Sequence, residues 1–160
     1  MFEDPGTWHQ LEPQQTNEGH PPCPRSLHAS VAVENMFYIF GGYDGTNRRN
    51  DFFRFNFRTT TWTEIFANDS DPPSARDRHT AVADSNKNIY IFAGYDGFNR
   101  VDDFYRYNIP EAKWSRVQAL NSDQGPSPRH SHTAVVYNGS MFIFGGYDGH
   151  YRADMFKFNF

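Results

Sequence analysis

The chain has little cysteine, little net charge and no long apolar run, and each shortage argues against a class of protein. Its single cysteine, Cys23, cannot form an internal disulfide and fits a reducing compartment, so we expect a cytoplasmic protein. No apolar stretch reaches the roughly 18 residues of a membrane span, and no signal-peptide pattern is present. The net charge of −4 predicts no overall attraction to nucleic acid or to an anionic membrane.

Aromatic and turn-forming residues are abundant and follow a repeat. Aromatics make up 18% of the 160 residues and are accompanied by 12 Gly and 10 Pro, which favours short β-strands. The hexapeptide Phe-Gly-Gly-Tyr-Asp-Gly at 40–45 returns as Phe-Ala-Gly-Tyr-Asp-Gly at 92–97 and in its first form at 144–149. The constant spacing predicts an array of one supersecondary unit.

Each unit is predicted to hold four short antiparallel strands. The first strand is a run of small residues and valine that follows a histidine at the same place in each unit. The second strand is an aromatic run that ends in the glycines. The third alternates aromatic and polar residues, as in 53–57, so we expect its aromatics on one face. The fourth begins with tryptophan. Four strands in about 52 residues are typical of one propeller blade.

The pattern resembles the kelch repeat. It combines Arg-x-x-His, a glycine pair after an aromatic strand, and a tryptophan seven residues after the third-strand aromatic, as from Phe55 to Trp62 and from Tyr107 to Trp114. The resemblance implies an all-β kelch-type β-propeller. Ala93 in place of the first glycine of the second unit is a mild departure. With its Pro-x-x-Arg-x-x-His segments, the chain is most similar to the kelch region of leucine-zipper-like transcriptional regulators and BTB-kelch adaptors.

We expect a single kelch-repeat array over 1–160. Residues 28–66 and 79–118 form complete blades, 132–160 form an incomplete third blade, and 1–12 supply the fourth strand of a preceding blade. Three blades are fewer than the usual four to eight. Two explanations stay open: the chain belongs to a longer propeller, or two copies form a homodimer that completes a six-bladed ring by exchanging their Trp8 strands.

The repeated glycines and tryptophans are predicted to be structural. A phosphate-binding loop would need a helix pattern after the glycines, and none follows, so we assign them to positive backbone angles and close blade packing. The tryptophans are expected to pack between blades. The residues of this structural group are Gly41, Gly42, Gly94, Gly145, Gly146, Trp8, Trp62 and Trp114.

We predict no catalytic residue, no metal site and no cofactor. His130 and His132 are spaced as metal ligands can be, but His132 belongs to the repeat and His130 does not. Cys23 lies in a proline-rich loop with no feature that would activate a thiol. The repeated aspartates lie in tight Tyr-Asp-Gly turns, where aspartate commonly caps its own backbone.

Loop lengths predict where a partner binds. In a four-stranded blade the second-to-third loop lies on the same face as the link to the next blade, and these are the long connections. We expect a protein or peptide to bind there, with Arg48, Arg100 and Arg152 as equivalent receivers of carboxylates or phosphates. The candidate binding residues are Tyr43, Arg48, Arg49, Tyr95, Phe98, Arg100, Tyr147, His150, Tyr151, Arg152, Arg76, Arg129 and His130. For Arg25, Arg76 and Arg129, bracing of a neighbouring turn is the open alternative.

The resemblance implies a protein-interaction module. Similar proteins include substrate-recognition domains for cullin-type ubiquitin ligases. The alternatives are an actin-associated kelch scaffold and a kelch-fold enzyme similar to galactose oxidase or the sugar epimerases. We expect no enzyme, because we find no cluster of acids and histidines that breaks the repeat.

Overall fold

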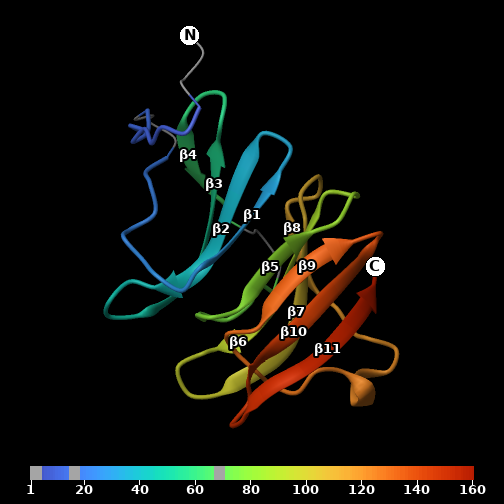
Figure 1. Ribbon diagram of the computed structural model, residues 1–160. Coiled ribbons are helices and arrows are strands. Elements are labelled where there is room, and N and C mark those ends of the chain that lie inside the picture. Colours follow the sequence, from blue (N-terminus) through green and yellow to red (C-terminus); the bar gives the residue numbers. More distant parts are fainter. Residues whose placement is uncertain (1–4, 15–18, 67–70) are drawn as a thin grey trace.

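The computed structural model describes residues 5–14, 19–66 and 71–160, which form three antiparallel sheets (Figure 1). The sheets follow the order β1-β2-β3-β4, β5-β6-β7-β8 and β11-β10-β9, and a short 3-10 helix, Ser122–Gln124, precedes the third. The prediction of an all-β array of antiparallel blades is therefore confirmed. The strands are β1 (Ala29–Val33), β2 (Met36–Tyr43), β3 (Arg48–Asn56), β4 (Thr61–Glu64), β5 (Thr80–Ala83), β6 (Asn88–Tyr95), β7 (Arg100–Asn108), β8 (Lys113–Arg116), β9 (Thr133–Tyr137), β10 (Ser140–Tyr147) and β11 (Tyr151–Asn159).

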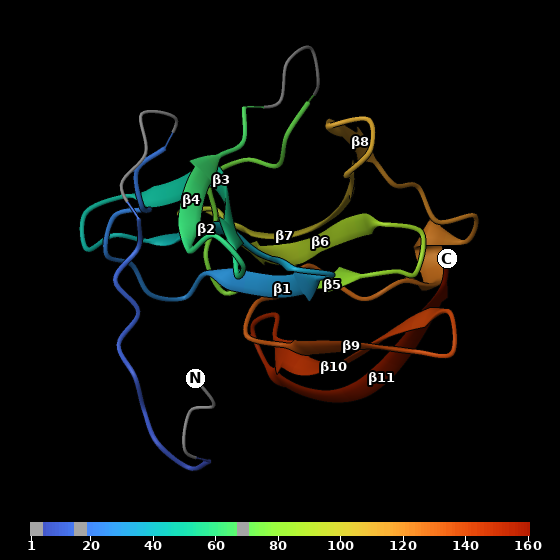
Figure 2. The same cartoon turned by 90° about the horizontal axis from the view of Figure 1, so that it is seen from above.

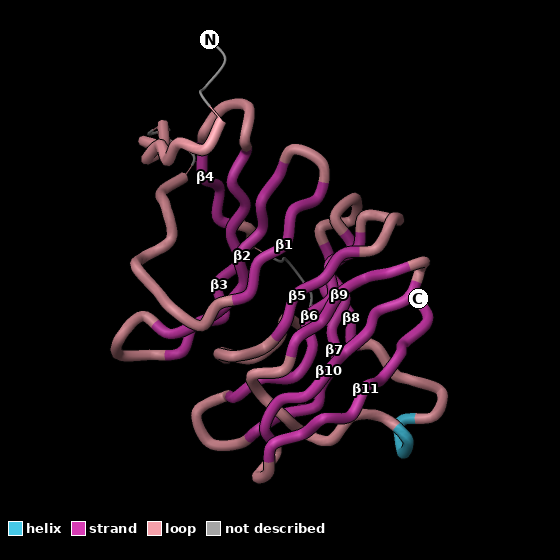
Figure 3. The backbone as a smooth tube through the Cα atoms, viewed as in Figure 1, coloured by secondary structure: helices cyan, strands magenta, loops and turns pink. Residues whose placement is uncertain are grey.

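The three sheets, which we call blades 1, 2 and 3, stack face to face with their first strands side by side. Strand β5 lies between β1 and β9 (Figure 2). Just before these strands, the N–H of Arg78 donates to the carbonyl of Leu27, and the N–H of Ser131 donates to that of Arg78, each at 2.9–3.0 Å. The inner ends of the blades are thus joined by main-chain hydrogen bonds. The tube in Figure 3 shows that neighbouring strands of each blade follow one another in chain order.

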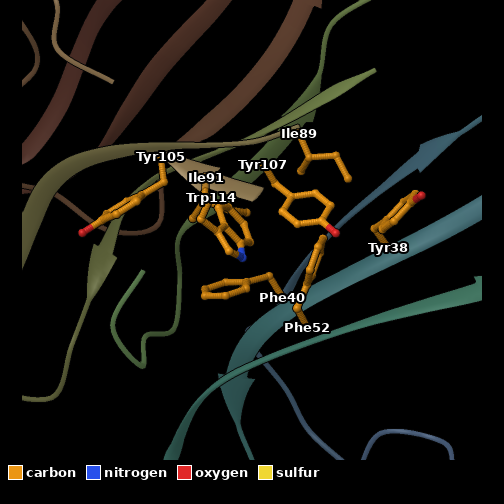
Figure 4. Close-up of a cluster of buried hydrophobic side chains, with 8 residues drawn as sticks. All are labelled: Tyr38, Phe40, Phe52, Ile89, Ile91, Tyr105, Tyr107 and Trp114. Atoms are coloured by element: carbon orange, nitrogen blue, oxygen red, sulfur yellow. The ribbon is translucent and has the colours of Figure 1, made fainter. Parts of the chain in front are cut away.

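Aromatic side chains bury on both faces of a blade, which differs from the prediction. Adjacent residues of a strand point to opposite faces, yet Phe52 and Phe53 of β3 are both buried. Phe53 packs within blade 1 against Trp62, whereas Phe52 packs against Tyr107 and Trp114 of blade 2 (Figure 4). The alternating pattern begins at Phe53 and therefore identified only the face to which Phe53 points. Phe52, the residue before it, forms part of the second apolar face.

The second glycine of each pair is required by close backbone approach. Gly42, Gly94 and Gly146 have φ between +96° and +110°, a region that disfavours side chains. A Cβ at these three positions would lie 2.6–2.9 Å from the carbonyl oxygen of the incoming link. A register shift between Phe40 and Gly42, and at both equivalent places, marks a bulge there.

The N-terminal segment lies outside the sheets. Residues 7–11 form no strand, and both Trp8 and Leu11 are exposed. In Figure 2 this dark blue segment runs away from the three sheets. That it forms the fourth strand of another blade stays a prediction, and residues 1–4 of the predicted strand lie outside the described residues. The described part of the chain holds no helix with the length and hydropathy of a membrane span.

Candidate functional site

The long connections gather on one face of the three blades, at the bottom of Figure 1. We call it the long-loop face; it comprises the loops 43–48, 95–100 and 147–151 and the ends of the links that precede β1, β5 and β9. In each blade a two-way main-chain pairing joins link to loop, through Ser26 and Tyr43, Asp77 and Tyr95, and His130 and Tyr147. The face therefore has a rigid main-chain frame.

An aspartate caps each loop. The Oδ1 atom of Asp44 accepts the N–H groups of Thr46 and Asn47 at 2.8 and 2.7 Å, and these bonds lower the pKa of the Asp44 carboxyl. Asp96 accepts two N–H groups in the same way at 2.7 Å, and Asp148 accepts that of His150 at 3.2 Å. These carboxylates fold their own loops, as expected for Tyr-Asp-Gly turns.

Arg48 and Arg100 reach across to the next blade. The guanidinium of Arg48 lies 4.7 Å from the ring centroid of Tyr95, and that of Arg100 lies 5.1 Å from the ring of Tyr147. Cation–π contacts of this kind contribute about 0.5–2 kcal/mol, depending on burial. Each arginine is thus both a candidate binding residue and a contact between neighbouring blades.

Arg152 is not the equivalent of Arg48 and Arg100, although the sequence spacing predicts that it is. The third loop is one residue shorter, so Tyr147 pairs with Tyr151, whereas Tyr43 pairs with Arg48. Arg152 consequently occupies the register position of Arg49. Its guanidinium binds Asp148 of its own loop at 2.6 Å, and this ion pair raises the pKa of Arg152 and lowers that of Asp148.

The arginine of each Arg-x-x-His motif braces its own blade. Arg76 is fully buried, donates to the carbonyl of Ala93 at 3.1 Å and forms a bidentate pair with Asp103, whose second oxygen lies 2.8 Å away. Arg129 makes the same contacts with Gly145 and Asp154. Because their guanidinium groups are enclosed, we remove Arg76 and Arg129 from the candidate binding residues.

Arg25 makes the equivalent contacts in blade 1, with the Gly41 carbonyl at 3.0 Å and with both oxygens of Asp51. The three aspartates were absent from the candidate residues. Each aspartate lies just before the aromatic residues of the third strand, in Asp51-Phe52, Asp103-Phe104 and Asp154-Met155-Phe156. This recurrence in the sequence was the signal that could have identified them.

One position of the frame changes its charge from blade to blade. It is Ser26 in blade 1, Asp77 in blade 2 and His130 in blade 3. The buried carboxylate of Asp77 forms ion pairs with Arg48 at 3.0 Å and with Arg78 at 3.1 Å. This carboxylate neutralises part of the positive charge in the middle of the face.

In blade 3 the same position carries no negative charge. Burial and the nearby charges of Arg78 and Arg100 lower the pKa of His130, so its ring is neutral at pH 7. The ring lies 6.0 Å from that of Tyr95 and 5.6 Å from that of Tyr147. The Nε atoms of Arg48 and Arg100 are both buried and form no hydrogen bond within the described ranges, but that of Arg48 lies 3.0 Å from the Asp77 carboxylate.

The most exposed candidate residues are aromatic or lie beside aromatic residues. Phe98 and Tyr151 are 90% and 91% exposed, and His150 is exposed next to Tyr151. Tyr43 is half-buried, and its hydroxyl donates to the carbonyl of Gly45. Arg49 is half-exposed and lies 3.3 Å from Asp51. The structure therefore places the remaining candidates on one face, at different depths.

The repeated histidines face the neighbouring blade. The Nε2 atom of His79 lies 3.1 Å from the carbonyl oxygen of Phe40, and that of His132 lies 2.9 Å from the Thr80 hydroxyl. Burial and the motif arginines lower the pKa of His79 to about 3 and that of His132 to about 4. Across 5–14, 19–66 and 71–160, no three His, Cys, Asp or Glu side chains converge on a possible metal position.

Comparison with known families identifies the repeat. The family described as the KLHDC2/KLHL20/DRC7 Kelch-repeats domain matches residues 4–160. The chain belongs to the kelch-repeat family. This confirms the resemblance on which the propeller prediction depended.

Kelch relatives of this chain carry different names. It is 35% identical over 143 residues to the Leucine-zipper-like transcriptional regulator 1 homolog of Drosophila melanogaster, covering 84% of this chain and 14% of the relative. Human Kelch domain-containing protein 3 is 32% identical, with 88% and 40% covered. N-(sulfonatooxy)prop-2-enimidothioate sulfolyase of Thlaspi arvense is 30% identical, with 96% and 44% covered. The chain thus spans less than half of each relative, and one relative is named as an enzyme.

Proposed function

We propose that the chain is a protein-interaction module that binds a partner protein or peptide through the long-loop face. The observation that carries the proposal is the contrast on this face between a repeated rigid frame and side chains that differ between blades. Phe98 and Tyr151 project into solvent from that frame. Arg100 lies two residues after Phe98 in the sequence. Aromatic residues and arginine are the types enriched at binding hot spots.

The charge pattern of the face supports an acidic group in the partner. Asp77 already pairs with Arg48 and Arg78, whereas Arg100 faces a neutral His130. A carboxylate or phosphate of the partner would pair with Arg100, whose guanidinium lies 5.1 Å from the ring centroid of Tyr147. We therefore propose a ligand that combines an acidic residue with apolar residues for Phe98 and Tyr151.

The experiment begins with peptides selected from a displayed random library on the wild-type chain. We expect acidic peptides, and we expect Phe98→Ser with Tyr151→Ser to weaken their binding by about 1,000-fold, because two hot-spot truncations of about 2 kcal/mol each remove about 4 kcal/mol. Arg100→Gln should weaken binding and reduce its salt dependence. Isothermal titration gives each Kd.

The matched control changes one phenylalanine and one tyrosine at the opposite ends of the strands, Phe57→Ser with Tyr137→Ser. Both side chains are partly exposed there, next to short turns. Binding should stay at the wild-type level in this control. Equal losses in the two double variants, or selected peptides without acidic residues, would contradict the proposal.

We also propose, from the similarity to leucine-zipper-like transcriptional regulators, that the bound protein is a substrate of a cullin-type ubiquitin ligase. Once a cellular partner is identified, its half-life in cells should lengthen when the Phe98→Ser, Tyr151→Ser variant replaces the wild-type sequence. An unchanged half-life, with binding lost, would contradict the ligase role and leave the interaction role intact.

A further inference from the structure

A cavity of about 220 Å³ lies between blades 1 and 2, toward the short turns at the top of Figure 1 and away from the long-loop face. Its lining belongs to the two complete four-stranded sheets and to the turn that follows β7. The lining side chains are of two kinds. The polar ones are Tyr38, Arg54, Thr63 and Tyr107, and the apolar ones are Ile65, Ile109 and Ala112.

Strand register explains why the polar side chains of blade 1 form a row. Tyr38, Arg54 and Thr63 lie directly opposite one another on β2, β3 and β4. Opposed residues of antiparallel strands carry their side chains on the same face of the sheet. Arg54 also shares its face with Phe52, two residues earlier on β3, and Phe52 packs against blade 2. The whole row therefore faces blade 2.

Blade 2 contributes Tyr107 from the opposite wall. The ring of Phe52 lies 5.7 Å from that of Tyr38 and 4.9 Å from that of Tyr107, so both tyrosines pack on one phenylalanine (Figure 4). Both tyrosines are only 3% exposed, whereas Arg54 is exposed. The arginine thus lies at the rim of the cavity, and the two phenol groups lie deeper.

The polar groups of the cavity are close enough to change one another's pKa. Burial raises the pKa of the Tyr38 hydroxyl, and the charge and hydrogen bonding of Arg54 oppose this rise. Burial also raises the pKa of Tyr107; the Tyr38 hydroxyl adds to that rise, and the charge of Arg54 opposes it. Because both pKa values are raised, both phenols are protonated at pH 7 and are able to donate hydrogen bonds.

The charge of Arg54 is not neutralised by an ion pair within residues 5–14, 19–66 and 71–160. Glu64 borders the cavity, but it lies opposite Phe53 on β3 and so carries its side chain on the other face of blade 1. There its carboxylate lies 3.5 Å from the ring of His20. The cavity therefore offers hydrogen-bond donors and a positive charge.

Blade 2 shows which kind of group such a row binds. Tyr90 and Arg106 are the register equivalents of Tyr38 and Arg54. The Tyr90 hydroxyl donates to the Oδ2 atom of Asp84 at 3.1 Å, and burial and this carboxylate raise the pKa of Tyr90 to about 12. Asp84 comes from the loop that joins β5 to β6. In blade 2, then, the chain supplies its own carboxylate to the tyrosine.

Blade 1 does not supply this carboxylate. The turn between β1 and β2 consists of Glu34 and Asn35 alone, whereas four residues, 84–87, join β5 to β6. The Glu34 carboxylate is exposed and lies 2.9 Å from the ammonium group of Lys87 on that longer loop. The Tyr38 hydroxyl consequently borders a cavity, whereas the Tyr90 hydroxyl contacts a carboxylate.

We propose that this cavity binds a small carboxylic acid with a compact apolar body, such as an aromatic acid. Its carboxylate pairs with Arg54 and accepts hydrogen bonds from Tyr38 and Tyr107, because a guanidinium and phenols are strong donors to carboxylate oxygens. Its apolar body packs on Ile65 and Ile109. An apolar cavity of about 150 Å³ holds benzene, so this one has room for benzoate. The inference is independent of the proposed function, since the long-loop face lies at the other end of the strands.

The test is a titration of the purified 160-residue chain with sodium benzoate, followed in amide NMR spectra. We expect saturable binding with a Kd of about 1 mM, which is within the ligand efficiency of so small a molecule. The amide signals of Thr63 and Ala112 should shift together, while that of Gly149 on the long-loop face should not. Benzamide has the shape without the charge, and inorganic phosphate has the charge without the apolar body. Each should bind about 10-fold more weakly than benzoate.

Three variants test the residues of the cavity. Arg54→Gln removes a charged hydrogen-bond donor from an exposed position and should weaken benzoate binding by about 20-fold. Tyr107→Phe removes a neutral donor and should weaken it by about 5-fold. Phenylalanine already occupies the equivalent position of blade 3, Phe158, so the fold accommodates this change. Arg58→Gln is the matched control, because Arg58 is an exposed arginine of the turn after β3 and is not part of the lining.

The control Arg58→Gln should bind benzoate like the wild type, and the circular dichroism spectra of all variants should be unchanged. Equal losses of binding in Arg54→Gln and Arg58→Gln would overturn the proposal. The absence of saturable benzoate binding would overturn it as well. Benzamide or inorganic phosphate that bound as tightly as benzoate would contradict the proposed class of ligand.

Discussion

The contact between blades 1 and 2 and the contact between blades 2 and 3 share their inner half and differ in their outer half. In both, a glycine N–H donates at 2.9 Å to the carbonyl of a motif arginine, from Gly42 to Arg76 and from Gly94 to Arg129. In both, a buried histidine meets a phenylalanine ring edge-on, at 5.5 and 5.4 Å. Only the first contact contains a tryptophan, and a cavity lies at the corresponding place in the second. Links and first strands are therefore sufficient to align two blades, and the fourth strand fills the space between them.

The largest effect is expected when the first contact is made to resemble the second. Trp114→Ala removes the ring from its socket of Phe40, Phe52 and Tyr107 and should lower the free energy of unfolding by about 3–5 kcal/mol. Urea denaturation followed by circular dichroism measures it. Leu120→Ala removes an exposed side chain and should change stability by less than about 0.5 kcal/mol. A loss below about 1 kcal/mol for Trp114→Ala would mean that the outer half contributes little.

The motif arginines test the inner half. Arg76→Met leaves the Asp103 carboxylate and the Ala93 carbonyl without their partner and should cost about 3 kcal/mol, at the lower end for breaking a buried ion pair. Arg129→Met should cost less, because Asp154 is more exposed than Asp103 and water can replace the lost partner. Denaturation of both variants gives the difference. A larger loss at Arg129 would contradict the role of solvent exposure.

Glycine substitutions should show that the inner halves are alike. Gly42→Ala and Gly94→Ala each place a Cβ within 2.8 Å of a link carbonyl at a positive φ, and both should cost about 2 kcal/mol. Gly45→Ala is the matched control, because its φ is +96° but a Cβ would meet nothing within 4 Å, so about 1 kcal/mol is expected. Similar losses at Gly45 and Gly94 would show that the backbone angle alone matters.

For one histidine and one pH unit, the smallest effect is a pH dependence. Burial lowers the folded-state pKa of His79 to about 3 and that of His132 to about 4, so unfolding takes up protons below the ordinary histidine pKa of about 6.5. Stability from these groups is complete above pH 6.5 and is lost as the pH falls, by about 1.4 kcal/mol per unit for each histidine until its folded pKa is reached. Melting curves from pH 7 to pH 5 check this. His79→Gln should lower the slope by about 1.4 kcal/mol per pH unit, and an unchanged slope would exclude His79 as a source.

Sequence reasoning was accurate where a property repeats and failed where one unit departs from the repeat. The hexapeptides, the tryptophan spacing and the Arg-x-x-His motifs correctly predicted the antiparallel strands of an all-β kelch array. Counting eight residues from Phe144 to Arg152 misaligned the third loop, because the register depends on main-chain pairing with β10 and a shorter loop shifts it. The burial of Phe52 was missed because its partner face belongs to a different blade.

The amino-acid order by itself determined the repeat, the strand class and the positions that only glycine tolerates, because these depend on local backbone geometry and on a side-chain period of two. Which arginines are buried was decided only by the tertiary structure. Arg76 is enclosed with Asp103 and Arg100 is not, although both belong to repeated motifs, because burial and pairing are set by residues more than twenty positions away or on the neighbouring blade. The packing of Trp114 between blades 1 and 2 and the cavity beside β11 likewise result from the stacking of the blades.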